Sequence, residues 1–312
     1  MTSSTLFNND YGQVTLCKLP LAHGFTENTS LEENADPFEG INISHRYCTA
    51  QLSLYGGQVL SFKPRDREEV FWLSRTSSYE AGKAIRGGIP LCWPWFGRND
   101  KQAIEQKVVN HGFARLHHWQ VERINADESG VVIILTLTGE NQHCLWPNAY
   151  KLTQTLFFGK KFTQTLAMAN LSTEDAQYSI ALHSYFNVSN PSNISIDALT
   201  GLSYYDKLTE QTAKQRQSVN CVGEIDRVYP SASGNKITFI DKEWQRKITI
   251  VSKNCQQWVL WNPGSVLANT MADIHEGGEH EYVCLEAANT TWQDLPASKS
   301  VVISQEITVT DL

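Results

Sequence analysis

The chain has no long apolar run and no excess of positive charge. Nowhere do about 18 consecutive apolar residues occur, so no segment is long enough to cross a membrane as a helix. Its 26 lysines and arginines face 33 aspartates and glutamates, a net charge of −7. Nucleic acid and anionic membranes bind through basic side chains, so neither is expected as a partner. Residues 1–10 lack the basic and apolar regions of a signal peptide, and we expect a cytoplasmic protein.

Paired cysteines and metal-ligand spacings are also absent. The seven cysteines form no Cys-x-x-Cys pair and no regular framework, which indicates reduced thiols. The segment 275–280 holds two histidines and two glutamates, but its spacing fits no helical or ribbon-type zinc motif. Its two adjacent glycines indicate a loop. We therefore expect no metal site.

A convincing helical period is missing as well. Short apolar runs rich in β-branched and aromatic residues, bounded by turn formers, predict strands instead. We expect them at 41–54, 59–62, 131–138, 152–158, 162–168, 180–188, 236–240, 247–251, 257–261, 282–286 and 301–309. Many strands without crossover helices predict an all-β fold, an antiparallel sandwich or barrel. No linker divides the chain, so we expect one domain over 1–312, with the first segment, ending between residues 10 and 30, peripheral to it.

Residues 83–115 carry the strongest chemical signal. Glycines and prolines favour tight turns there, tryptophans offer apolar faces to a sugar ring, and Arg86 and Arg115 provide guanidinium forks for phosphate or carboxylate oxygens. An anion carried on a ring would suit this combination. The alternative from the residues alone is a structural turn with two ordinary surface cations.

Seven blocks in this order resemble glucose-6-phosphate 1-epimerases, which belong to the aldose 1-epimerase or galactose mutarotase-like superfamily. The blocks are Gly-Lys-Ala-Ile-Arg-Gly-Gly-Ile-Pro (82–90), Trp-Pro-Trp-Phe-Gly (93–97), His-Gly-Phe-Ala-Arg (111–115), Ala-Leu-His-Ser-Tyr-Phe (181–186), Asp-Arg-Val-Tyr (226–229), Trp-Val-Leu-Trp-Asn-Pro (258–263) and Val-Cys-Leu-Glu-Ala-Ala-Asn (283–289). The resemblance implies a galactose mutarotase-like supersandwich of antiparallel sheets, with its site in a groove on one face.

The same resemblance implies a catalytic pair. On its own, His183 could be a structural histidine on a strand, and Glu286 could be either a rim charge or a buried acid/base group. In the family the corresponding residues are catalytic, so Glu286 would be the base and protonated His183 the acid that open and close the sugar ring. This chemistry requires no cofactor.

The resemblance also implies the substrate contacts. Asp226 would accept hydrogen bonds from sugar hydroxyls, and Arg86 with Arg115 would hold the phosphate. Asn110 and His111 are further candidates, although His111 could equally only shape its loop. The expected activity is α/β anomer exchange of a hexose 6-phosphate by a monomer or weak oligomer. The alternatives are a mutarotase for unphosphorylated aldoses and a noncatalytic carbohydrate-binding protein.

Overall fold

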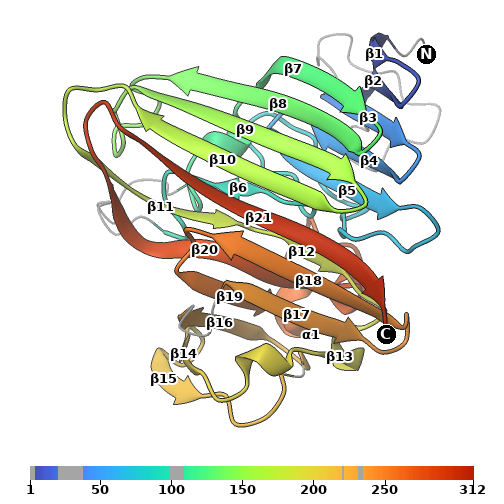
Figure 1. The fold of residues 1–312 in the computed structure, drawn as a ribbon. Helices are drawn as coiled ribbons and strands as arrows, with labels where there is room; N and C mark the ends of the chain where they lie inside the picture. The colour runs from blue at the N-terminus through green and yellow to red at the C-terminus, as the bar shows by residue number, and fades with distance from the viewer. Residues whose placement is uncertain (1–3, 20–37, 99–108, 220, 231–234) are drawn as a thin grey trace.

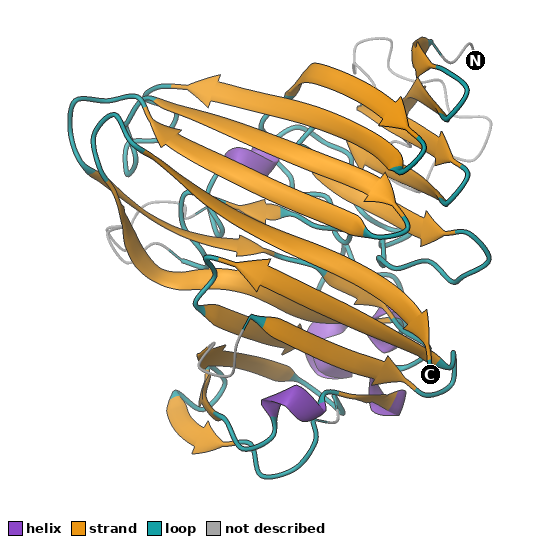
Figure 2. Ribbon diagram, viewed as in Figure 1, coloured by secondary structure: helices purple, strands orange, loops and turns teal. Residues whose placement is uncertain are grey.

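Strands build almost the whole molecule. The computed structural model describes residues 4–19, 38–98, 109–219, 221–230 and 235–312, and there the chain forms three antiparallel sheets (Figure 1). Helices are few and short in this described part (Figure 2): α1 (Gly264–Ala268) and the 3-10 turns η1 (Ala114–Leu116), η2 (Pro191–Asn193), η3 (Asp197–Leu199) and η4 (Gly278–His280). None of these is long and apolar enough to cross a membrane. The all-β prediction is confirmed.

The first sheet, called the N-terminal sheet, holds five strands in chain order: β1 (Thr5–Asn8), β2 (Gly12–Lys18), β3 (Glu39–His45), β4 (Cys48–Ser53) and β5 (Gln58–Pro64). The opening strands are hydrogen-bonded into this sheet, and Val14 of β2 is fully buried in the core. That residues 1–312 form one domain with a peripheral first segment stays a prediction from the sequence.

The second sheet, called the β10 sheet, spans Figure 1 from β7 to β17. Its strand order is β13 (Ile194–Ser195), β17 (Lys236–Asp241), β18 (Arg246–Lys253), β21 (Ser300–Asp311), β10 (Phe162–Asn170), β9 (Tyr150–Gly159), β8 (Gly130–Gly139) and β7 (Gln120–Asp127). Residues alternate strictly between its faces: along β10, every second side chain is buried. This period-2 pattern places an apolar face on the core.

The third sheet, called the β20 sheet, runs in the order β15 (Gln211–Lys214), β14 (Ser203–Asp206), β16 (Ile225–Pro230), β19 (Gln257–Asn262), β20 (Tyr282–Leu295), β11 (Ala176–Leu182) and β6 (Leu91–Cys92), with β12 (Tyr185–Asn187) also paired to β20. Buried residues of all three sheets belong to one core cluster. Phe62 of β5 contacts Phe158 and Phe162, and Phe186 of β12 contacts Phe239. The β10 sheet therefore packs against both other sheets.

Three predicted strands differ from the structure. The run 41–54 is interrupted by a turn at Arg46 and Tyr47, which reverses the chain between β3 and β4. The run 180–188 is broken between Leu182 and Tyr185. The strand predicted to end at Glu286 continues to Leu295, because the residues that follow still pair with β19 as far as Ala288 and with β11 as far as Leu295. Apolar content alone could not reveal these boundaries.

A chain of buried amides crosses the inner face of the β10 sheet. Gln164 donates to Gln154 (2.6 Å) and Gln305 donates to Gln164 (2.8 Å), and all three side chains are fully buried. Gln154 donates in turn to the Gly57 carbonyl (2.6 Å), while Gln305 exchanges hydrogen bonds with the Ser184 hydroxyl. Each amide is satisfied by the next, as burial in an apolar core requires.

Gln164→Leu removes the middle of this chain and leaves the Gln154 carbonyl oxygen without its donor. The Gln305 amide loses one acceptor as well. We expect the free energy of unfolding to fall by about 1–3 kcal/mol or more, the usual penalty for unsatisfied buried polar groups. Urea denaturation measures it.

The matched control is Gln13→Leu, which changes an exposed glutamine on β2. Equal stability of the two variants would show that the buried chain contributes nothing to folding.

Candidate active site

The outer face of the β20 sheet gathers the predicted site residues. Along β20, Val283 and Leu285 enter the core, so the alternation turns Cys284 and Glu286 to the opposite face. Glu286 therefore lies within a continuous strand and not at its end. Glu286 is paired with Val259 of β19, and the next residue, Ala287, is paired with both β19 and β11, so the backbone that carries the carboxylate is fixed.

Cross-strand register brings further side chains to this face. Asp226 of β16 is paired with Trp261 of β19, Trp261 with Cys284 of β20, and Cys284 with Tyr185 of β12. Paired residues in a sheet project to the same side. An acid, two aromatic rings and a thiol therefore form one row, and Glu286 lies two residues along the strand from that row.

His183 lies where β11 gives way to β12. Its backbone N–H donates to the Pro90 carbonyl (3.2 Å), and the next residue, Ser184, is tied to Gln305 of the amide chain. Alternation along β11 sends Leu182 to the core and His183 to the outer face. Because β11 ends at Leu182 and β12 begins at Tyr185, His183 has no strand partner, while Leu182 and Tyr185 on either side are paired with β20.

His183 and Glu286 meet on this face. His183 Nε2 lies 3.3 Å from Glu286 Oε1, although more than a hundred residues separate them in sequence. Their exposed fractions are 8% and 1%. The Tyr185 ring stacks on the imidazole, with centroids 4.8 Å apart and planes 11° apart, and Trp261 meets it edge-on at 6.1 Å. The pair is thus walled by aromatic rings.

Burial governs the protonation of both groups. It lowers the pKa of His183 well below the usual 6.5, and the charges of Arg115 and Arg86 lower it further. Burial also raises the pKa of Glu286 well above its usual 4.5, an effect that Lys207 opposes and Asp226 reinforces. Both shifts favour the neutral form of each group, so burial favours a pair that holds one proton, on the carboxyl group.

Several buried polar atoms on this face lack a hydrogen-bond partner among the described residues. They include His183 Nδ1, Glu286 Oε2, Asp226 Oδ1 and the Tyr282 hydroxyl. Unsatisfied buried polar atoms are costly and uncommon in native proteins. Their concentration here is typical of a site that a polar ligand completes.

The two predicted arginines differ in their partners. Arg86 Nε and Nη2 each lie 2.9 Å from Asp273 Oδ2, and Nη1 donates to the Tyr185 hydroxyl (2.9 Å). Asp273 matches its charge. Arg115 donates from Nη2 to the Asn110 carbonyl (2.9 Å), and its buried Nε has no partner within the described chain. Among the described residues, Arg86 thus meets a carboxylate and Arg115 a neutral carbonyl.

Gly88 and Gly112 allow the tight turns in the loops that carry Arg86 and Arg115. A side chain at Gly88 would place Cβ 2.1 Å from the Val59 carbonyl oxygen, and one at Gly112 would lie equally close to that of Trp93. Both glycines also have positive φ. Only glycine allows the backbone to approach this closely.

His111 and Asn110 occupy the loop before Arg115. The Gly97 N–H donates to His111 Nδ1 (3.1 Å), which makes that nitrogen an acceptor, and burial lowers the pKa of His111 well below its usual value. The His111 ring lies edge-on to His183, with centroids 5.7 Å apart. His111 therefore both shapes its loop and borders the pair, whereas the Asn110 side chain is exposed.

Sequence reasoning missed Lys207 and Asp273. Lys207 follows β14, and its ammonium lies 3.6 Å from Asp226 Oδ1 and 4.7 Å from the Phe96 ring centroid. Both residues belong to turns without a recognisable motif, and their partners are far apart in sequence. No cluster of three or more acidic, histidine or cysteine side chains suited to a metal occurs in the ranges described.

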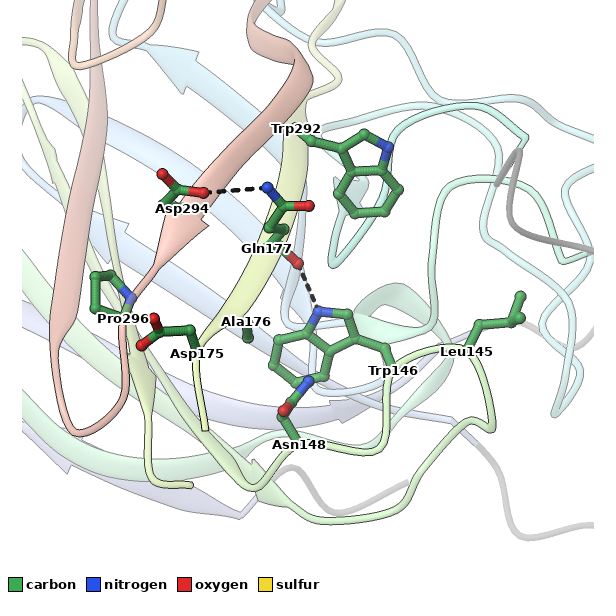
Figure 3. Close-up of a pocket in the computed structure, with 9 residues that line it drawn as sticks. All are labelled: Leu145, Trp146, Asn148, Asp175, Ala176, Gln177, Trp292, Asp294 and Pro296. Carbon is green, nitrogen blue, oxygen red and sulfur yellow. Dashed lines mark hydrogen bonds between the residues drawn. The ribbon is translucent and has the colours of Figure 1, made fainter. Parts of the chain in front are cut away.

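Two larger cavities lie on or near the β20 sheet. One, of about 630 Å³, is lined by Phe96, Lys207 and, on β14, Tyr204 and Tyr205, among others. It reaches the site only through Lys207 and Phe96, since none of the predicted site residues lines it. The other, of about 520 Å³, lies where β11 begins and β20 ends, and is lined by Trp146, Asp175, Trp292 and Asp294 among others (Figure 3). It contains none of the predicted site residues.

Known proteins share this sequence and fold. A profile of the aldose 1-epimerase family matches residues 39–303. A protein of Salmonella typhimurium is 33% identical over 262 residues (82% of this chain, 85% of its own), and one of Escherichia coli is 32% identical over 280 (88% and 91%). Both carry the provisional name glucose-6-phosphate 1-epimerase. The crystal structure of a provisionally named mutarotase from Salmonella typhimurium superposes with a TM-score of 0.81 and 31% identity, covering 88% of this chain and 91% of that one.

The imidazole of His183 should titrate below 6.5, because burial and nearby cations both oppose its charge. NMR of the histidine ring carbons against pH measures the pKa directly. In Arg115→Met the pKa of His183 should rise, since Arg115 is the largest charged contributor. The exposed Arg216→Met is the matched control. A pKa above 6.5 in the unmodified protein would contradict the neutral pair.

Proposed function

The chain belongs to the aldose 1-epimerase family, and we propose that it interconverts the α and β anomers of hexose 6-phosphates, with glucose 6-phosphate as the substrate. The observation that carries the proposal is the buried His183–Glu286 pair, 3.3 Å apart beside three cationic side chains. The names of its relatives supply the substrate class.

Anomer exchange needs one base and one acid. The base takes the proton of the C1 hydroxyl while the acid protonates the ring oxygen, so the C1–O5 bond breaks and a free aldehyde forms. Rotation about C1–C2 presents the other carbonyl face, and closure reverses both transfers. We assign Glu286 as the base and His183 as the acid.

The single proton of the pair suits this reaction. Moving it from the Glu286 carboxyl group to His183 produces carboxylate and imidazolium, the base and acid required, without a proton from solvent. The buried, aromatic surroundings keep the neutral form lower in free energy until substrate hydroxyls stabilise the charged one. Glu286 Oε2, which has no described partner, is free to accept the C1 hydroxyl.

We propose that Asp226 accepts sugar hydroxyls through Oδ1, which lies 3.6 Å from the Lys207 ammonium but accepts no hydrogen bond from the described residues, and that Trp261 offers an apolar face. Arg115, Asn110 and His111 border the same face and are proposed to contact the substrate. Arg86, whose donors are taken by Asp273 and Tyr185, is proposed to support the wall beside His183. The cytoplasmic location and the monomeric or weakly oligomeric state stay predictions from the sequence.

Glu286→Gln tests the chemistry. The amide keeps the shape of the side chain but cannot accept the hydroxyl proton, so exchange should fall about 10²–10⁴-fold with little change in affinity for glucose 6-phosphate. His183→Asn should behave likewise. Exchange NMR on equilibrated glucose 6-phosphate, with and without enzyme, measures the rate.

The same measurement on free glucose identifies the substrate class. Much faster exchange on glucose 6-phosphate supports the proposal, whereas equal rates would favour a mutarotase for unphosphorylated aldoses. Binding of sugar without any acceleration would indicate a noncatalytic carbohydrate-binding protein. Full activity in Glu286→Gln would show that another residue is the base.

The pH dependence follows from the two shifts. The active pair carries one proton, so kcat/KM should form a bell. Its acid limb, where His183 also becomes protonated, should lie below 6.5, and its alkaline limb, where Glu286 loses its proton, should lie well above 4.5. An alkaline limb at the ordinary glutamate value would contradict this assignment.

A further inference from the structure

The three cationic side chains at the site, Arg86, Arg115 and Lys207, differ in how far their charge is neutralised by partners in the protein. Arg86 uses Nε and Nη2 on Asp273 and Nη1 on the Tyr185 hydroxyl, so its charge and its directed donors are matched inside the protein. Tyr185 in turn stacks on His183. Arg86 is thereby built into the wall that positions the imidazole, and it brings no net charge to a ligand.

Lys207 is placed differently. Its backbone N–H donates to the Asp226 carbonyl (2.9 Å), which fixes the turn after β14 beside β16. The ammonium lies over the face of Phe96 and 3.6 Å from Asp226, too far for a short hydrogen bond. The side chain remains one-third exposed, so its donors can reach a ligand.

Contacts between rings connect this lysine to the acid/base pair. Phe96, beneath the ammonium, lies 5.0 Å from the His111 ring, and His111 lies 5.7 Å from His183. Phe96 and Lys207 also line the 630 Å³ cavity, which none of the predicted site residues lines. Lys207 therefore lies between Asp226 of the candidate site and open space where the remote end of a substrate can lie.

Charge arithmetic favours Lys207 over Arg86 as a phosphate ligand. A phosphoryl group carries about −1.5 to −2 near neutral pH. Arg115 has no carboxylate partner among the described residues, and Lys207 has only a loose one, whereas Arg86 and Asp273 cancel. Arg115 and Lys207 both oppose the raised pKa of Glu286, which places both within electrostatic reach of one site.

We propose that Lys207 and Arg115 bind the 6-phosphoryl group of the substrate, and that Arg86 is a positioning residue for Tyr185 and His183. This inference rests on the proposed function, because it concerns a sugar that carries a phosphate. Phe96 holds the ammonium by a cation–π contact, and Asp226 keeps its second role as an acceptor of sugar hydroxyls.

The test compares kcat/KM for glucose 6-phosphate with that for glucose in Lys207→Met, Lys207→Arg, Arg115→Met and Arg86→Met. Lys214→Met, an exposed lysine on the neighbouring strand β15, is the matched control. Lys207→Met and Arg115→Met should lower the ratio of the two values tenfold or more, mainly through KM for the phosphorylated sugar. Lys207→Arg keeps a cation and should retain most of the ratio. Arg86→Met should lower both values together, mainly through kcat.

Competition by inorganic phosphate provides a second readout. Phosphate should inhibit the unmodified enzyme and the Lys214→Met control equally, and should inhibit Lys207→Met at least tenfold more weakly. If the ratio of kcat/KM for glucose 6-phosphate to that for glucose were unchanged in Lys207→Met, or were lowered in Arg86→Met instead, the assignment of Lys207 to the phosphate would be wrong. The proposed epimerase activity would not be affected by that result. Equal losses on both sugars with a shifted pH profile would also overturn the assignment, since Lys207 would then act only on Glu286. An unmodified enzyme without exchange on glucose 6-phosphate would instead reject the proposed function itself.

Discussion

The geometry of the site depends on the buried amide chain of Gln154, Gln164 and Gln305. One end of the chain holds the Gly57 carbonyl, and the other holds Ser184, next to His183. Each buried amide is costly unless it is paired, so the chain is stable only when all its members keep their places. A break anywhere would leave several polar groups unsatisfied in an apolar core. The irregular backbone around His183 is thereby fixed by the regular β10 sheet behind it.

The same region fixes the Arg86 loop. Gln58, which follows Gly57, is fully buried and donates to the carbonyls of Ile85 (3.2 Å) and Gly87 (2.7 Å). Two segments without regular pairing, one bearing His183 and one bearing Arg86, are thus tied to a common polar network. Glu286 needs no such support because it lies within a continuous strand. In the acid/base pair, Glu286 is fixed by strand pairing, whereas His183 is fixed by the hydrogen bonds of its neighbour Ser184 in the core.

Much of the fold follows from alternation in the sequence. The hairpin of β9 and β10, with its two Thr-Gln-Thr segments, is predictable because every second residue is apolar or, at Gln154 and Gln164, buried and amide-paired. The resemblance located His183 and Glu286, and the structure brings them together. The short strands β14, β15 and β16 are missing from the predicted set, because β14 and β16 mix apolar and charged side chains, such as Tyr204 and Arg227, and β15 is exposed throughout.

The sequence predicts many of the strands, but it does not predict which side chains pair with one another in the folded protein. Arg86 and Arg115 occur in similar glycine-bearing turns, yet within the part of the chain that the structure describes only Arg86 meets a carboxylate, and that carboxylate is 187 residues away. Lys207 belongs to a turn without a motif and reaches the site only because β14 pairs with β16. A count of basic residues therefore does not measure the positive charge available to an anion. What matters is the charge left unmatched after folding, and among the described residues of this face it lies on Arg115 and, in part, on Lys207.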